Sequence, residues 1–199
     1  MKIILVGASG TIGQKVYNNL SARHEVIKAS ANQGDIIVDI TDYASIKRMY
    51  KAVPNVDAVV CAAGGAHFGP FDSMTEDDFY IGIRDKMMGQ INLVMIGKEF
   101  LNDRGSFTLI TGILAEDPIR MGVGLSTVNG AVNAFVKAAA IELKRGLRIN
   151  VVCPGLVEDA VEKYARYFPG HNPVSMDRVV SGYLKSVEGA ATGNVIKIY

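Results

Sequence analysis

The feature that most constrains this chain is a series of short, apolar, β-rich segments separated by longer segments with helical periodicity. The strand candidates are Lys2–Val6, Glu25–Ala29, Ile36–Asp39, Ala58–Ala62, Ser106–Thr111, Arg148–Val152 and Val195–Ile198. Several are apolar throughout, which is typical of parallel strands covered on both faces. The helical patterns lie at Thr11–Ala22, Tyr43–Ala52, Thr75–Asn102, Thr127–Arg145 and Met176–Val187. This order predicts an α/β fold: a doubly wound parallel sheet of about seven strands with helices on both faces.

Composition and charge exclude several classes of protein. The chain has 199 residues, of which 49% are hydrophobic, and its 21 Lys and Arg against 20 Asp and Glu leave a formal charge of +1. Disorder requires low hydrophobicity and high net charge, so it is excluded. A near-neutral chain has no electrostatic attraction to nucleic acid or to an anionic membrane, and we expect neither as a partner. No linker or repeat divides the sequence, so we expect one domain over residues 1–199.

The two cysteines, Cys61 and Cys153, both lie inside apolar runs. They form neither a disulfide framework nor a metal-binding spacing, so we expect buried free thiols and no metal site. The apolar run at the N-terminus is too short for a signal-peptide core, and no segment reaches the length of a membrane helix. These features predict a cytoplasmic protein.

A glycine-rich turn directly follows the first strand candidate and opens the first helix. Gly7 permits a tight turn off the strand, Gly10 leaves room for a pyrophosphate, and Gly13 allows close packing of the helix. The helix N-terminus attracts phosphate charge. The turn therefore predicts a Rossmann-type NAD(P)-binding domain. The cofactor-binding residues expected here are Gly7, Ser9, Gly10, Thr11, Ile12 and Gly13.

With this turn in place, the chain resembles the short-chain dehydrogenase/reductase superfamily, from Met1 to about Gly155 in good register and more loosely to Tyr199. The resemblance rests on three further stretches that match cofactor-contacting positions of the family: Asp39 and Ile40; Ala62, Ala63 and Gly64 after Cys61; and Pro154 and Gly155. It implies an NAD(P)(H)-dependent oxidoreductase that acts on a small carbonyl or alcohol. It also implies a homodimer or homotetramer.

The end of the second strand candidate bears on cofactor preference. An acidic residue there favours NAD, because it bonds the ribose 2′-hydroxyl. This chain has no acid at that place, and Ser30 or Asn32 can donate to a phosphate, whereas Lys28 lies mid-strand and is expected to point away. NADP(H) is therefore favoured, with NAD(H) as the alternative.

The positions that carry catalysis in the resembled family are all altered here. The family uses a Tyr and a Lys four residues apart on one helix, with a Ser upstream and an Asn on the preceding helix. The matching positions hold Leu125, Asn129, Gly112 and Lys86. Leucine has no ionisable proton, so the family's usual acid–base step cannot run from Leu125.

Substitutes for the missing groups can be named, and the catalytic residues stay open. Lys86 could stabilise an oxyanion, Thr111 or Ser126 could bond a carbonyl, and Tyr164 or Tyr167 could supply a phenol. Each has a structural alternative: a surface charge for Lys86, hydroxyls bonded to backbone for Thr111 and Ser126, and packing for the tyrosines. Two functions follow. One is an oxidoreductase with a non-standard proton donor, and the other is a catalytically silent NAD(P)-binding sensor or scaffold.

The segment of residues 156–173 carries no strand signal. It contains Pro169, Gly170 and Pro173 and is expected to hold a short helix followed by a loop at the sheet edge where ligands bind. A lid over the substrate and a plain surface connection are both consistent with this composition.

Overall fold

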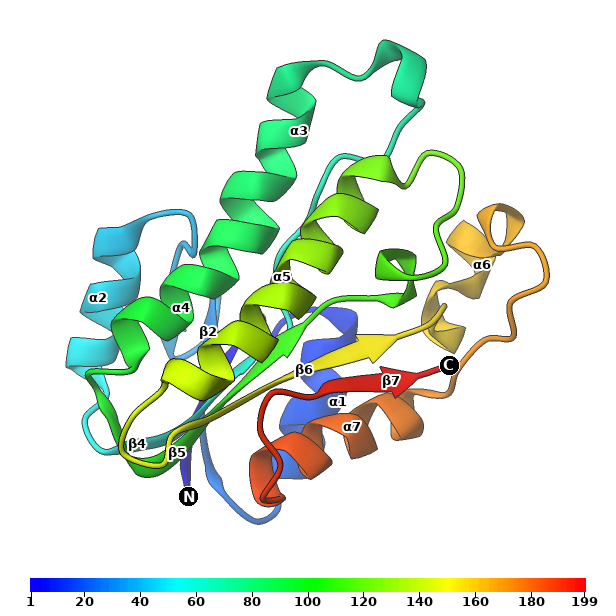
Figure 1. The fold of residues 1–199 in the computed structure, drawn as a ribbon. Coiled ribbons are helices and arrows are strands. Elements are labelled where there is room, and N and C mark those ends of the chain that lie inside the picture. Colours follow the sequence, from blue (N-terminus) through cyan, green and yellow to red (C-terminus); the bar gives the residue numbers. More distant parts are fainter.

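The computed structural model describes all residues, 1–199, and its centre is one seven-stranded sheet (Figure 1). Every pair of neighbouring strands is parallel, in the order β3-β2-β1-β4-β5-β6-β7. The strands are β1 (Lys2–Val6), β2 (Glu25–Ser30), β3 (Ile36–Ile37), β4 (Val56–Cys61), β5 (Leu101–Ile110), β6 (Arg148–Pro154) and β7 (Val195–Ile198). The order reverses beside β1, which makes the sheet doubly wound. The predicted fold class is confirmed.

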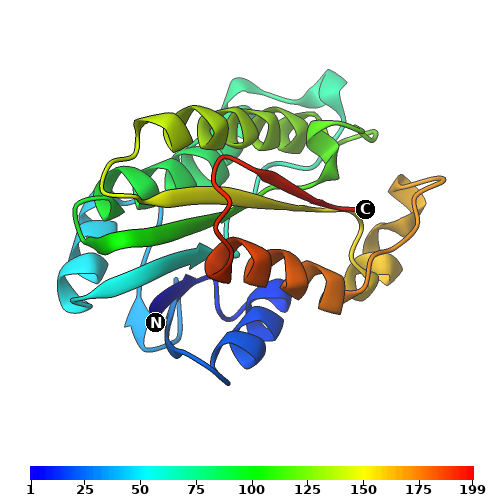
Figure 2. The same ribbon diagram turned by 60° about the horizontal axis from the view of Figure 1, so that its bottom comes forward.

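Helices cover both faces of the sheet, as Figure 2 shows. Helices α1 and α7 pack together on one face, and α2, α4 and α5 lie on the other. The helices are α1 (Thr11–Leu20), α2 (Tyr43–Ala52), α3 (Glu76–Gly82), α4 (Gly89–Gly97), α5 (Val123–Glu142), α6 (Val161–Tyr164) and α7 (Met176–Glu188). None of them is both long and apolar enough to cross a lipid bilayer.

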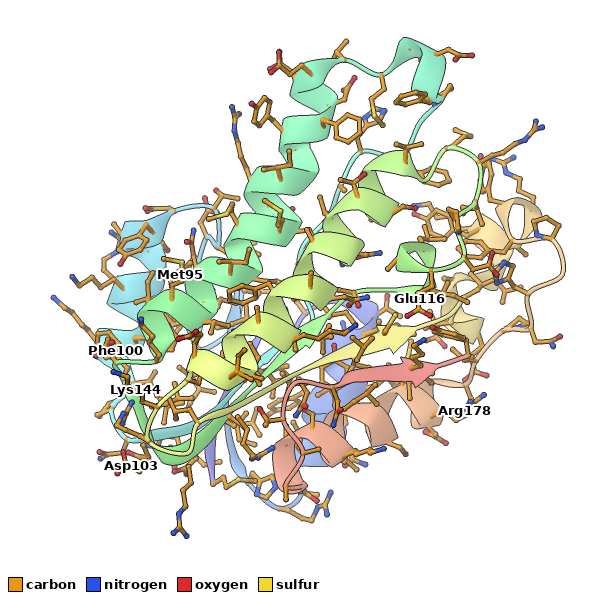
Figure 3. The ribbon with its side chains drawn as sticks, in the orientation of Figure 1. Met95, Phe100, Asp103, Glu116, Lys144 and Arg178 are labelled. Atoms are coloured by element: carbon orange, nitrogen blue, oxygen red, sulfur yellow. The ribbon has the colours of Figure 1, made fainter.

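The core is the sheet itself with the inward faces of these helices, and the apolar residues of β1 and β4 are almost fully buried. Several polar groups in the core are paired. Tyr50 donates to the carbonyl of Leu93 (2.7 Å) and links α2 to α4. At the edge of the sheet, Glu116 accepts a hydrogen bond from the Tyr199 hydroxyl (2.8 Å) and pairs with Lys197, which anchors the end of β7 (Figure 3).

The helical segment expected over Thr75–Asn102 is wrong at its C-terminal end. Helix α4 stops at Gly97, and β5 begins at Leu101. The start of β5 is masked in the sequence by three polar residues and by an irregularity at Arg104, whose φ of +64° departs from extended geometry. A bend of this kind interrupts the apolar pattern by which a strand is recognised.

The helix expected over Thr127–Arg145 begins earlier, at Val123, and ends at Glu142. Glycines at its start conceal the first turn, because glycine is a poor helix former. The helix ends because Leu143 is already extended (φ −65°, ψ 131°); Arg145 and Gly146, both with positive φ, follow in the connection to β6. The strand expected over Ile36–Asp39 is ladder-bonded only at Ile36 and Ile37.

Candidate functional site

The glycine turn between β1 and α1 is closely packed. Gly7 has a φ of +83°, and its N–H donates to the carbonyl of Ala29 (2.8 Å). A Cβ on Gly13 would lie 2.0 Å from the Gly7 oxygen, so only glycine lets α1 approach the turn this closely. No side chain caps the N-terminus of α1, so the amides of its first turn are available to an anion.

A cleft of about 580 Å³ opens above this turn, at the carboxyl ends of β1, β2 and β4. Nine of the predicted cofactor-binding residues line it together: Gly7, Ser9, Gly10, Ser30, Asp39, Ile40, Ala62, Ala63 and Gly64. Thr11 is outside the lining, and Gly13 faces the Gly7 carbonyl rather than the cleft. The carboxyl ends of the strands, beside the point where the order reverses, are where doubly wound sheets bind ligands.

Asp39 is held in a fixed orientation at the rim of this cleft. Its carboxylate accepts hydrogen bonds from the Thr41 hydroxyl (2.7 Å) and from the Thr41 N–H (2.8 Å). These bonds favour the charged form and lower the pKa of Asp39. The carboxylate is therefore ionised and directed by its own loop.

A smaller hollow of about 270 Å³ adjoins the cleft and shares Ser9 and Ser30 with it. Lys28 lines this hollow, with its Nζ 5.0 Å from the centroid of the Tyr17 ring. The expectation that Lys28 points away from the cofactor cleft agrees with its absence from the cleft lining. Lys28 nevertheless lines the same hollow as the two serines that the hollow and the cleft have in common.

A second cavity, of about 380 Å³, lies at the carboxyl ends of β5 and β6, and 12 of its 19 lining residues are hydrophobic. It adjoins the cleft, because Gly64 and Asp85 line the cleft while Gly65 and Lys86 line the cavity. The predicted cofactor residues Ile12, Pro154 and Gly155 belong to this cavity. Cleft and cavity therefore lie side by side at the carboxyl ends of the strands.

The 156–173 segment forms one wall of the cavity. It contains α6 between two short 3₁₀ turns, and Leu156, Val157, Ala160, Tyr164 and Phe168 line the cavity from this side. The short helix followed by a loop is present as predicted. Tyr167 is outside the lining and packs edge-on against Phe68, with 5.0 Å between the ring centroids.

The polar groups that line the cavity include three of special interest: Lys86, Thr111 and Asn129. The Thr111 hydroxyl already donates to Oδ1 of Asn133 (2.8 Å). Asn129 is only 3% exposed and its Oδ1 has no partner, while its Nδ2 lies 3.5 Å from the point where a side chain on Gly112 would begin. Ser126 is buried without a partner inside α5, but it does not line the cavity.

Lys86 is not the surface charge that was one interpretation of the sequence, because its residue is 6% exposed. No carboxylate lies within ion-pairing distance of its Nζ. Burial away from water disfavours the ammonium and lowers the pKa of Lys86. A buried amine without a counter-ion is uncommon in a structural role, because its charge is costly to bury.

Two features that sequence reasoning missed fix the position of Lys86. Residues Ile83–Met88 form a π-helical turn between α3 and α4, and such turns are frequent at functional sites. Gln90 ties this turn to β5: its Nε2 donates to the carbonyls of Lys86 (3.1 Å) and Ile110 (2.9 Å), and its Oε1 accepts from the Ile110 N–H (2.8 Å). A buried polar residue in an otherwise apolar helix is the one signal in the sequence that could have indicated Gln90.

Residues 11–185 match the family model described as Enoyl-(Acyl carrier protein) reductase. The Oxidoreductase UcpA of Escherichia coli is 27% identical over 163 residues, which are 76% of this chain and 60% of that protein. L-xylulose reductase from Bos taurus is 23% identical over 94% of this chain and 84% of its own length. The chain thus spans about 60% of the length of the first of these relatives.

Solved structures share the same architecture. The protein lin1944 from Listeria innocua superposes with a TM-score of 0.98 over the whole of both chains, at 48% identity. A small-chain dehydrogenase in complex with NADPH superposes with a TM-score of 0.88, at 24% identity, over 100% of this chain and 96% of that one. The sheet order and the glycine turn define a dinucleotide-binding fold. The family match shows that the chain belongs to the short-chain dehydrogenase/reductase superfamily.

Proposed function

We propose that this protein is an NAD(P)(H)-dependent oxidoreductase that interconverts a small carbonyl compound and its alcohol with a non-standard proton donor. The observation that carries the proposal is the junction of cleft and cavity: nine residues of the expected dinucleotide site line the cleft, which adjoins a largely apolar cavity. Such a cavity, with a few convergent polar groups, is suited to a small substrate.

The residues of the cleft fit a nicotinamide dinucleotide. Gly10 leaves open space, since a Cβ there would meet its nearest neighbour only at 3.5 Å, and the uncapped amides of α1 suit the pyrophosphate. Asp39 and Ile40 would hold the adenine end, and Pro154 and Gly155 would border the nicotinamide. When bound, the nicotinamide supplies or accepts the hydride. The NADPH complex of the related dehydrogenase supports this assignment.

NADP(H) is the proposed cofactor, with NAD(H) as the alternative. No acidic side chain from the end of β2 lines the cleft to repel a 2′-phosphate, and Lys28 stands in the hollow that shares Ser9 and Ser30 with the cleft. A single positive charge near a phosphate strengthens binding of the phosphorylated cofactor alone. The preference is therefore assigned to Lys28 together with Ser9, since the Ser30 hydroxyl already donates to the carbonyl of Gln33.

The remaining parts of the proposal concern the surroundings of the site. The 156–173 segment acts as a lid, because its side chains form a wall of the cavity and Phe68 packs edge-on against its Tyr164 (6.1 Å between centroids). A homodimer or homotetramer is proposed, supported by exposed apolar side chains on α4 and α5, among them Met95 (Figure 3) and Ile141. We further propose a cytoplasmic location.

A catalytically silent NAD(P)-binding sensor or scaffold is the second candidate. Its specific support is that Leu125 and Gly112 line the cavity without an ionisable or hydroxyl group. The two candidates share the cofactor site and differ in whether hydride leaves the nicotinamide. NADPH oxidation in the presence of small aldehydes and ketones therefore separates them.

Calorimetric titration with NADPH and with NADH tests the cofactor assignment. We expect a dissociation constant in the micromolar range for NADPH, about −8 kcal/mol, and weaker binding of NADH. The variant Lys28→Met should weaken NADPH by roughly tenfold, about 1.4 kcal/mol, and leave NADH unchanged. The matched control is Lys15→Met, which removes an exposed charge from α1 outside the hollow. Binding of neither cofactor below about 1 mM would refute the proposed function.

A further inference from the structure

The cavity beside the cofactor cleft contains a buried amine, Lys86, that the fold leaves without a counter-ion. Thr111 is already engaged by Asn133, and Ser126 lies outside the lining. Of the polar atoms around the cavity, the Lys86 Nζ has no ion-pair partner and Asn129 has an amide with an unpaired oxygen. Buried polar groups are normally satisfied, so the unpaired Asn129 oxygen requires an explanation, and the Lys86 amine that lines the same cavity is open to a ligand.

We propose that Lys86 is the catalytic proton donor of this protein and that the Asn129 amide is the second hydrogen-bond donor to the same substrate oxygen. The substrate is accordingly a ketone or aldehyde with an apolar body and no compulsory charged group. This inference rests on the proposed function, since it requires a hydride source in the adjoining cleft.

The groups that face Lys86 leave its proton free for a ligand. Cys61 on β4 and Cys153 on β6 are the titratable side chains of other elements that interact electrostatically with Lys86, and burial raises the pKa of Cys61 to about 11 and also raises that of Cys153. Both thiols are therefore neutral at pH 7. Asp85, from the same π turn, is engaged by the Gly65 N–H (3.0 Å). An electron-rich oxygen entering the cavity is thus the partner that the amine lacks.

The surroundings of Asn129 aim its amide at the same space. Its Nδ2 lies 3.5 Å from the position of a Cβ on Gly112, so the absence of a side chain at Gly112 leaves that amide open to the cavity. A neutral N–H donor and an ammonium on one oxygen stabilise the charge that develops there during reduction.

The backbone of Lys86 is held in place by contacts on two sides. A Cβ on Gly64 would lie 2.9 Å from the Lys86 Cα, so glycine is required for the π turn to sit this close to the end of β4. Gln90 holds the Lys86 carbonyl from the other side (3.1 Å). Rigid placement of an acid is what proton transfer over hydrogen-bond distance requires.

The proposed step balances in atoms and charge. A hydride adds to the carbonyl carbon, the C=O π bond breaks, and its electron pair takes a proton from the Lys86 ammonium. The carbonyl is reduced to an alcohol, the reduced nicotinamide is oxidised, and Lys86 becomes a neutral amine that regains a proton from water. A lowered pKa brings Lys86 nearer to the working pH, at which a general acid is most effective.

The test uses benzoate as a probe, because its ring suits the apolar walls and its carboxylate resembles the developing oxyanion. Benzoate is titrated calorimetrically at pH 7.5 and at pH 9.5, with and without NADP⁺, in two buffers of different ionisation enthalpy at each pH, which reports proton uptake. The wild type should bind benzoate with uptake of a proton fraction. Lys86→Met should weaken benzoate at least tenfold and abolish the uptake. The exposed Lys98→Met is the matched control and should change nothing.

Carbon-13 NMR of protein labelled at the lysine Cε positions covers the case in which Lys86→Met fails to fold. In the wild type, one lysine should titrate below the others and move upward when benzoate binds. Three results would each overturn the proposal. The wild type and a folded Lys86→Met could bind benzoate equally well, the wild type could fail to bind benzoate, or no lysine of the wild type could titrate below the others. Lys86-dependent benzoate binding in a wild type that binds no NADP⁺ would overturn the proposed function, and with it the catalytic role of Lys86, and would leave Lys86 as an anion-binding group only.

Discussion

Replacing Gly13 by alanine tests the packing on which the cofactor cleft is built. The new Cβ would lie 2.0 Å from the Gly7 oxygen, whereas ordinary contacts begin at 3.4 Å, so turn and helix must separate by about 1.4 Å. Overpacking costs up to about 3 kcal/mol and is offset by about 1 kcal/mol of improved helix propensity. We therefore expect a net loss of about 2 kcal/mol in the free energy of unfolding.

Thermal unfolding followed by circular dichroism measures this loss. For a chain of this length, about 2 kcal/mol corresponds to a fall in Tm of about 4–8 °C. NADPH binding should be lost as well, since the displaced atoms belong to the turn that lines the cleft. The matched control is Gly130→Ala in α5, where nothing lies within 4 Å of the new Cβ. That variant should gain stability, by up to about 1 kcal/mol.

Comparing Gly13→Ala with Gly130→Ala decides whether the close packing of the glycine turn is needed for stability and for NADPH binding. If Gly13→Ala keeps the Tm and the NADPH affinity of the wild type, the close approach of α1 to the turn after β1 does not depend on glycine. A fall in Tm for both variants alike would point to a general effect of alanine in these helices, and the specific packing argument would fail.

Three further predictions concern other parts of the molecule. Arg148 donates to the carbonyls of Ser186 and Val187 at the end of α7; Arg148→Met should lower the free energy of unfolding by about 2 kcal/mol, read from urea titration. Because the folded-state pKa of Lys86 is lowered, the unfolded chain binds the extra proton, so stability should rise with pH toward about 10.5, and Lys86→Met should flatten that rise in urea titrations at several pH values. Asn129→Ala should lower carbonyl reductase activity by about a hundredfold, measured as NADPH oxidation, because it removes one of the two donors to the substrate oxygen; a folded, cofactor-binding variant with unchanged activity would contradict the role of Asn129.

Much of the fold could be predicted from the sequence, because its determinants are local. The apolar runs of β1 and β7 and the helix Tyr43–Ala52 have the expected bounds. The errors fall where backbone irregularity overrides periodicity, as at Arg104 in β5. A positive φ at a non-glycine residue leaves no reliable mark in the sequence.

The candidate site could be predicted only in part. The cleft residues follow from the glycine turn and from strand ends, which meet at one sheet edge in any parallel sheet. The burial of Lys86 could not be predicted, because it depends on a π turn and on close contact with Gly64 in the loop after β4. Lysine is almost never fully buried, so sequence reasoning assigns it to the surface by default.

A crystal structure of the protein with NADP⁺ would test the central claim most directly. We expect the pyrophosphate on the amides at the start of α1, the 2′-phosphate beside Ser9, Ser30 and Lys28, and the nicotinamide at the mouth of the cavity that contains Lys86. The expected separation between phosphate oxygens and their donors is about 3 Å. A dinucleotide bound elsewhere, or a nicotinamide turned away from that cavity, would contradict the account.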